Sequence, residues 1–211
     1  MPAPGADYGQ GFEPLHPLSV VYATWEDSPA QINGRLHWAE RAKKQGTPGN
    51  LWIADMRAKG HIWAAQSRYE TPALTPAGEG LRALARAKEA RLLVIDTLGV
   101  AFGASEIDRS QVGAFFADWA SWADEDDCVV LLIAHPPKTA GTNYSGSTGM
   151  LGGVRAMWCI EKVQQKGEEG DSQTSAYRLV NAKQNYTDDK SSIWLDNQFG
   201  LWVETEAAAY R

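Results

Sequence analysis

The first half of the chain alternates between short apolar runs and longer stretches in which apolar residues recur every three or four positions. Residues 18–25 are mostly apolar and rich in Val and Tyr, which predicts a buried strand. Ser28 then precedes a proline, and Gln31 stands three residues after the serine, as at a capped helix start. The pattern predicts a helix from this cap to about Lys44.

Two further strands and a helix follow with the same alternation. Residues 51–56 predict a short strand, and Thr75 followed by Pro76 predicts the start of a helix that ends near Ala90. Residues 92–96 are apolar up to a terminal aspartate, as expected of a strand that is covered by helices on both faces.

The next stretch predicts a loop, an aromatic helix and a last buried strand. We expect residues 97–108 to form a loop and residues 109–124 to form an amphipathic helix. Five side chains at helical spacing, which we expect to pack on the sheet, mark that helix: Val112, Phe115, Phe116, Trp119 and Trp122. Residues 128–134 predict a buried strand, and residues 136–149 predict a loop rich in Gly, Ser, Thr and Pro.

The pattern changes after residue 154 to short strands joined by polar turns. Strands are predicted at 155–163, 176–182, 192–195 and 201–204, with a turn at 196–200. Strands that alternate with helices and are followed by such hairpins predict an α/β fold. In this fold a mainly parallel sheet carries an antiparallel β extension at one edge.

Composition narrows the class of protein without deciding its function. The chain has 211 residues, 44% of them hydrophobic, and fits one domain at 18–205 between a loose lead-in at 1–17 and a tail at 206–211. Its net charge of -6 excludes a surface that is basic throughout, so a nucleic-acid contact would need a local loop or an assembled ring. No apolar stretch exceeds strand length and only two cysteines occur, so we expect a cytoplasmic protein that does not enter a membrane.

Polar side chains stand where three of the predicted strands end. Glu26, Asp96 and His135 each follow an apolar run. Ligands bind beyond the carboxyl ends of parallel strands, so we expect these three side chains to share one crevice. A rigid strand that ends in Asp96 and Thr97 suits a magnesium-bound nucleotide, because it aims the carboxylate at the metal. Taken singly, each residue also fits a helix cap or an ordinary surface position.

Five segments of the chain stand in the order found in one group of ATPases. Residues 20–28 (Val-Val-Tyr-Ala-Thr-Trp-Glu-Asp-Ser) are similar to the segment after the P-loop helix, and residues 92–98 (Leu-Leu-Val-Ile-Asp-Thr-Leu) to the Walker B strand. Residues 131–138 resemble the next strand of the group, residues 145–155 its loop and arginine, and residues 181–186 its late lysine-bearing strand. The chain thus resembles the RepA-type hexameric replicative helicases, which are RecA-like P-loop ATPases.

The resemblance implies a RecA-like three-layer core that binds ATP and Mg²⁺. In such a core Glu26 would be the catalytic base that activates water, and His135 would sense the terminal phosphate. Asp96 would hold Mg²⁺ through water and, together with Thr97, would contact the nucleotide. The resemblance covers about residues 18–205.

The resemblance also implies partners and two further residues. Arg155 would act as an arginine finger on a neighbouring subunit of a homo-oligomeric ring, a hexamer, and Lys183 would reach the nucleotide. Arg155 fits a solvated strand position equally well. Single-stranded DNA is an expected partner in phage or plasmid replication, although Ser145 stands where relatives often carry arginine, and Lys138 is the only charged residue from 136 to 149.

One element of the group is missing from the sequence. A P-loop reads Gly-x-x-x-x-Gly-Lys-Ser/Thr because glycine amides wrap the phosphates and the lysine neutralises their charge. The chain contains no Gly-Lys pair, and only 17 residues precede the first predicted strand, whereas a strand, loop and helix need about 30. We expect a fold that lacks its P-loop strand and helix, either as a truncated gene product or as a chain completed in trans by a P-loop-bearing partner segment.

Two other functions stay open. The chain could be a non-catalytic RecA-like scaffold or ring partner in a replication or mobile-element complex. It could also be an unrelated hydrolase that uses Glu26, Asp96 and His135 around a metal, which the lack of any close pair of metal ligands disfavours.

Overall fold

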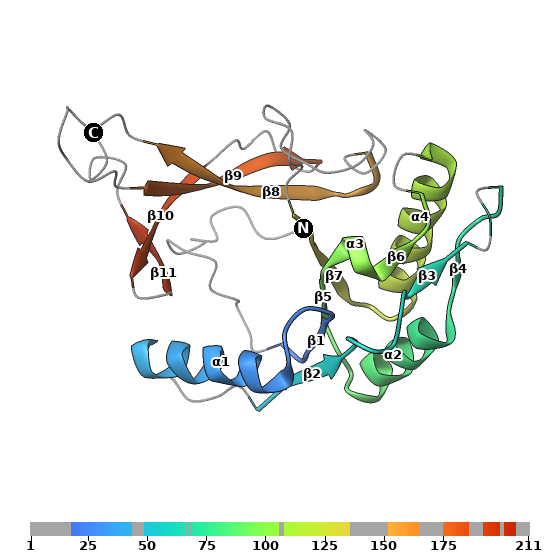
Figure 1. Cartoon of the computed structure of the whole chain (residues 1–211), viewed down its shortest axis with the longest axis horizontal. Helices are drawn as coiled ribbons and strands as arrows, with labels where there is room; N and C mark the ends of the chain where they lie inside the picture. Colours follow the sequence, from blue (N-terminus) through green and yellow to red (C-terminus); the bar gives the residue numbers. More distant parts are fainter. Residues whose placement is uncertain are drawn as a thin grey trace, which may run out of the picture. The chain divides into compact units, whose positions relative to one another are not determined.

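The computed structural model of the chain describes residues 18–43, 49–65, 67, 69–105, 108–135, 152–164, 175–185, 192–198 and 201–205. The chain forms two compact units, one over Pro17–Val154 and one that contains the C-terminal strands from Arg155 onward. Each unit is built around sheets of its own (Figure 1).

The first unit is built on a four-stranded sheet with the strand order β2-β1-β5-β7. β1 (Val20–Thr24), β2 (Leu51–Asp55), β5 (Leu92–Asp96) and β7 (Val129–Ile133) all fall within predicted apolar runs. Each strand pairs in parallel with its neighbours. The prediction of an α/β fold with a mainly parallel sheet is therefore confirmed.

Two helices begin at the caps that the sequence predicts. α1 (Pro29–Lys43) follows Ser28, whose amide donates to Gln31 Oε1 at 2.8 Å, while the Gln31 amide donates to Ser28 Oγ at 3.2 Å. α2 (Pro76–Ala87) follows Thr75, whose side-chain oxygen accepts a hydrogen bond from an amide of the first turn. These contacts satisfy amides that a helix start otherwise leaves unpaired, which explains why both helices begin where they do.

A third helix closes one face of the parallel sheet. α4 (Arg109–Glu125) buries the predicted stripe of five apolar and aromatic side chains in the core, so the expected packing role of the stripe is confirmed. The same core contains Leu81 and Ala85 of α2. In the described part of the chain, no helix has both the length and the apolar character needed to cross a membrane.

A small second sheet joins the long loops of the first unit. β3 (Trp63–Ala64) pairs with β4 (Ala73–Leu74) and with β6 (Phe102–Gly103), and α3 (Leu98–Ala101) precedes β6. The expectation that residues 97–108 form only a loop is wrong for this segment. Strands of two residues are too short to show any alternation of apolar and polar positions, so the sequence pattern could not reveal them.

The two faces of the parallel sheet are buried to different degrees. Register partners share a face, because side chains alternate along a strand. Val21 and its partner Leu93 have no exposed surface and belong to the core with α2 and α4. On the opposite face Tyr22 is half-buried, and Leu131 of β7 is 49% exposed. Val94 is the register partner of Tyr22, and Asp96 stands two residues after Val94. The carboxyl group of Asp96 therefore belongs to the same, more open face as Tyr22.

Aromatic rings fill the centre of the core. Trp63 lies within 4.3 Å of Trp119 and 5.5 Å of Phe115, measured between ring centroids. Its Nε1 donates a hydrogen bond to Asp118 Oδ2 at 3.1 Å, so the one polar atom of the ring is satisfied. The small sheet therefore anchors the first unit through Trp63, a residue that the sequence pattern did not place in the core.

The second unit is an antiparallel sheet with the strand order β11-β10-β9-β8. Its members are β8 (Ala156–Gln164), β9 (Ser175–Gln184), β10 (Ser192–Gln198) and β11 (Leu201–Thr205). The predicted antiparallel hairpins are confirmed. The expectation of a turn at 196–200 is wrong for residues 196–198, because β10 continues to Gln198, which pairs with Leu201.

Replacing Trp63 by alanine is expected to destabilise the protein by about 3–5 kcal/mol, because it empties a buried ring site and leaves Asp118 without its donor. Trp38→Ala is the matched control: Trp38 is 62% exposed, so its loss is expected to change the free energy of unfolding by no more than about 0.5 kcal/mol. Denaturant titrations of both variants measure the difference. Equal effects would show that Trp63 does not anchor the core.

Candidate functional site

The backbone register brings the ends of three strands together. Asp96, the last residue of β5, pairs with Thr24 of β1 on one side and with Ile133 of β7 on the other. The amide of Trp25 donates to the Asp96 carbonyl at 2.8 Å and extends the pairing of β1 with β5. The residues that follow β1 and β7 therefore leave the sheet at the same edge as Asp96.

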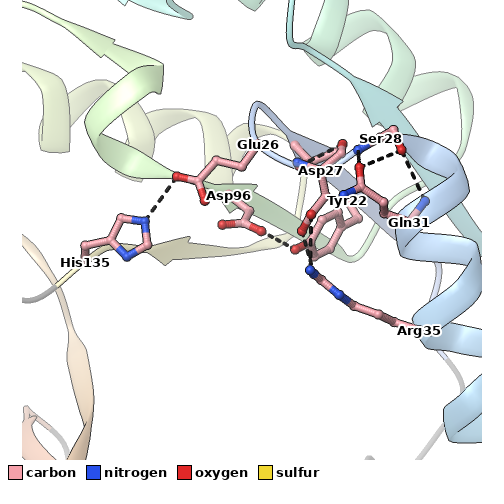
Figure 2. A network of polar contacts seen from close by, with 9 residues as sticks. Tyr22, Glu26, Asp27, Ser28, Gln31, Arg35, Asp96 and His135 are labelled. Atoms are coloured by element: carbon pink, nitrogen blue, oxygen red, sulfur yellow. Dashed lines mark hydrogen bonds and ion pairs between the residues drawn. The ribbon is translucent and has the colours of Figure 1, made fainter. Parts of the chain in front are cut away.

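Glu26 and His135 meet across this edge. His135 Nε2 lies 3.1 Å from Glu26 Oε1, within hydrogen-bond distance (Figure 2). The Glu26 side chain is 46% exposed and that of His135 is 72% exposed, so solvent reaches both groups. The bond joins the end of β1 to the end of β7, which lie on opposite sides of β5.

Asp96 has a different partner. The hydroxyl of Tyr22, which points from β1, donates a hydrogen bond to Asp96 Oδ2 (Figure 2). The structure thus brings Glu26 and His135 into direct contact and places Asp96 at the same edge, bonded to a tyrosine. Tyr22 lies inside a predicted buried strand, and reasoning from the sequence did not identify it as part of the site.

An ion pair borders the site on the side of α1. Asp27 accepts hydrogen bonds from the guanidinium of Arg35, at 3.1 Å from Nη2 to Oδ1 (Figure 2). Burial raises the pKa of Tyr22 above its usual value, and the hydrogen bond to Asp96, the charge of Asp96 and the charge of Asp27 raise it further. Arg35 acts in the opposite direction, but its effect is smaller. Tyr22 therefore stays protonated and remains a donor at neutral pH.

Thr97 lies inside the first unit at the beginning of α3. The residue is 3% exposed, and its carbonyl accepts hydrogen bonds from the amides of Val100 and Ala101. The peptide bond between Asp96 and Thr97 is cis. The structure thus places Thr97 directly beside Asp96 but in the interior.

Arg155 and Lys183 belong to the second unit. Arg155 precedes β8, and its carbonyl accepts a hydrogen bond from the Asn185 amide at 3.1 Å. Lys183 of β9 pairs with Met157 of β8. The two basic residues therefore lie at one end of the β8–β9 pair, where the Arg155 side chain is exposed and Lys183 is half-buried.

Comparison with known protein families accounts for most of the chain. The family model described as an AAA domain matches residues 2–141, which include β1, β5, β7 and all three strand-end residues. The chain belongs to the AAA domain family. This membership supports the assignment of the chain to the P-loop-related, RecA-like ATPase superfamily, whose members use nucleotides. A comparison with curated proteins finds no match.

The polar edge of this AAA domain fits the metal part of a magnesium-bound nucleotide. Among the described residues no group of three or more His, Cys, Asp and Glu side chains could hold a metal ion by itself. Magnesium does not need such a group, because it is commonly held by one or two carboxylates, by water and by the phosphates of the substrate. Asp96, at the end of a rigid strand, is suited to that role.

The phosphate part is not supplied by the same edge. Residues 24–28, 96–97 and 133–135 contain acidic groups and a histidine but no lysine or arginine. The nearby Arg35 is bonded to Asp27. The positive charge that phosphates bound here need would therefore come from cationic groups elsewhere.

The raised pKa of Tyr22 predicts how stability depends on alkaline pH. The folded state favours the neutral phenol, so its contribution is fully present below about pH 10, the usual pKa of tyrosine, and is lost as pH rises through the higher pKa of the folded state. Above about pH 10 the wild type is expected to lose stability more steeply than Tyr22→Phe. Tyr69→Phe, which alters a tyrosine that is 82% exposed, is the control. Denaturant titrations across this range measure the slopes, and parallel slopes would contradict the burial of the Tyr22 phenol.

Proposed function

We propose that this AAA domain is the ATP-hydrolysing domain of a RepA-type replicative DNA helicase. The observation that carries the proposal is the hydrogen bond between Glu26 and His135 at the same sheet edge as Asp96. A nucleotidase needs a group that orients water, a group that contacts the terminal phosphate and a carboxylate for the metal. These three chemical types stand here at the ends of three adjacent parallel strands.

Each residue of the edge has a distinct part in this proposal. Glu26 orients the attacking water and accepts a proton from it. His135 can donate its ring N–H either to Glu26, as in the structure, or to the terminal phosphate, so it links the presence of the phosphate to the position of the base. Asp96 binds the water shell of the metal. Thr97 fixes the backbone directly after Asp96, at the start of α3. Mg²⁺, when bound, neutralises charge that develops on the phosphates.

The basic residues of the second unit complete the proposal. In a single ATPase domain over residues 18–205, Arg155 is the arginine finger that acts on the nucleotide of a neighbouring subunit, and Lys183 contacts the nucleotide. This arrangement needs an oligomer, and AAA-type domains commonly oligomerise. We propose a homo-hexameric ring that moves along single-stranded DNA.

Hydrolysis also needs a phosphate loop. The 211 residues contain no Gly-Lys pair, and the described edge holds no free cation. We propose that a strand–loop–helix segment with the pattern Gly-x-x-x-x-Gly-Lys-Ser/Thr, from outside these residues, completes the site. The same observations favour the alternative function, in which the domain is a scaffold or ring partner that binds no nucleotide.

Binding of a non-hydrolysable ATP analogue with Mg²⁺ distinguishes the two functions. We expect the full chain alone to bind the analogue weakly, and the full chain mixed with a separately made P-loop segment to bind it with clear magnesium dependence. Asp96→Asn is expected to weaken the magnesium-dependent binding by about tenfold or more, because it removes the charge that faces the metal shell. Fluorescence anisotropy of a labelled analogue measures the dissociation constant of each sample.

Asp55→Asn is the matched control for this experiment. Asp55 ends β2 as Asp96 ends β5, and both pair with Thr24 in the same row of the sheet, but Asp55 is held by Arg57 at 2.6 Å. Its replacement should leave analogue binding unchanged. Equal losses in both variants, or no magnesium-dependent binding by the mixture, would reject the ATPase proposal, and the second outcome would favour the scaffold.

Turnover tests the role of Glu26 separately. In the same mixture Glu26→Gln is expected to lower the rate of ATP hydrolysis by about 100-fold or more while analogue binding stays within about twofold of the wild type. An amide retains the size of the side chain but cannot accept the proton. Hydrolysis at the wild-type rate in this variant would show that Glu26 is not the base.

A further inference from the structure

The bond between Tyr22 and Asp96 follows from the register of two adjacent strands. Tyr22 pairs with Val94, and Asp96 stands two residues farther along β5, on the same face of the sheet. The phenol ring is long enough to span this diagonal, and its hydroxyl reaches Asp96 Oδ2 (Figure 2). β1 lies between β2 and β5, so hydrogen bonds on both sides fix the backbone that carries Tyr22.

The same bond restricts the Asp96 carboxylate. A carboxylate at a strand end can rotate about its side-chain torsions, and each free rotation costs entropy when a ligand orders it. A donor on Oδ2 fixes the plane of the group and therefore the direction of Oδ1. Tyr22 is half-buried, so water competes less for this bond than at a fully exposed position.

The chemistry of the donor suits a metal-facing carboxylate. A tyrosine hydroxyl is neutral, so it orients Asp96 without cancelling the negative charge that a cation would need. Asp55, the strand-end residue in the same row, is instead bonded to the guanidinium of Arg57 through both carboxylate oxygens. The charge of Asp55 is thus neutralised by Arg57, whereas Asp96 keeps its charge and is oriented by Tyr22.

We propose that Tyr22 is a positioning residue that holds the Asp96 carboxylate in the orientation required by the Mg²⁺ of a bound nucleotide. This inference rests on the proposed function. Tyr22 touches neither the metal nor the nucleotide and acts only through Asp96. Its loss therefore weakens the response to magnesium and leaves the other contacts of the nucleotide in place.

The test compares Tyr22→Phe with the wild type in the mixture of full chain and P-loop segment. The variant keeps the ring and removes only the donor. The Mg²⁺ concentration that half-saturates analogue binding is expected to rise by about tenfold, as for other groups that orient metal ligands. Analogue binding in EDTA is expected to stay unchanged, whereas a merely structural role would weaken binding with and without magnesium. Tyr69→Phe controls for the loss of a tyrosine hydroxyl.

A double variant shows whether Tyr22 acts through Asp96. If it does, adding Tyr22→Phe to Asp96→Asn should raise the magnesium requirement by less than twofold beyond that of Asp96→Asn alone, because the two effects are not additive. Full additivity would overturn the proposal. An unchanged magnesium requirement in Tyr22→Phe, with normal wild-type binding, would refute the positioning role alone. Absence of magnesium-dependent binding in the wild type would instead refute the proposed function, and this inference with it.

Discussion

The hydrogen-bonded register of β1, β5 and β7 is the constraint on which the candidate site depends. Parallel pairing aligns Thr24, Asp96 and Ile133 in one row, so the chain leaves all three strands at the same edge. A shift of one strand by a single residue would turn its side chains to the other face. The contact between Glu26 and His135, which are 109 positions apart in the sequence, exists because two separate pairings with β5 fix both strand ends.

Much of the fold could be predicted, because its long elements carry their own signals. Apolar runs of five to eight residues indicated the four parallel strands, and the serine and threonine caps indicated the starts of α1 and α2. The small sheet gave no such signal. Trp63 is placed by long-range contacts, such as the hydrogen bond from the Ile62 amide to the Ala101 carbonyl, and no local periodicity encodes them.

The candidate site could be predicted only in part. The rule that ligands bind beyond the carboxyl ends of parallel strands predicts that Glu26, Asp96 and His135 lie at one edge, and the structure places them there. It could not identify Tyr22, because an aromatic residue in the middle of an apolar strand is typical of core packing. Only the register between β1 and β5 shows that its hydroxyl reaches a carboxylate, so this part of the site is a property of two strands rather than of one segment.

The open face of the sheet connects the fold to the chemistry. Tyr22 and Asp96 lie on the face opposite the core of α2 and α4, and on that same face Leu131 is 49% exposed. Parallel sheets are ordinarily covered on both faces. At about 4 Å, two unit charges interact by about 1 kcal/mol in water but by about 4 kcal/mol at the effective dielectric of a partly enclosed protein site. A segment that covered this face would therefore strengthen every charge interaction of Asp96 and Glu26. If the same segment also supplied phosphate-binding amides, one structural addition would provide both the enclosure of the site and its phosphate contacts.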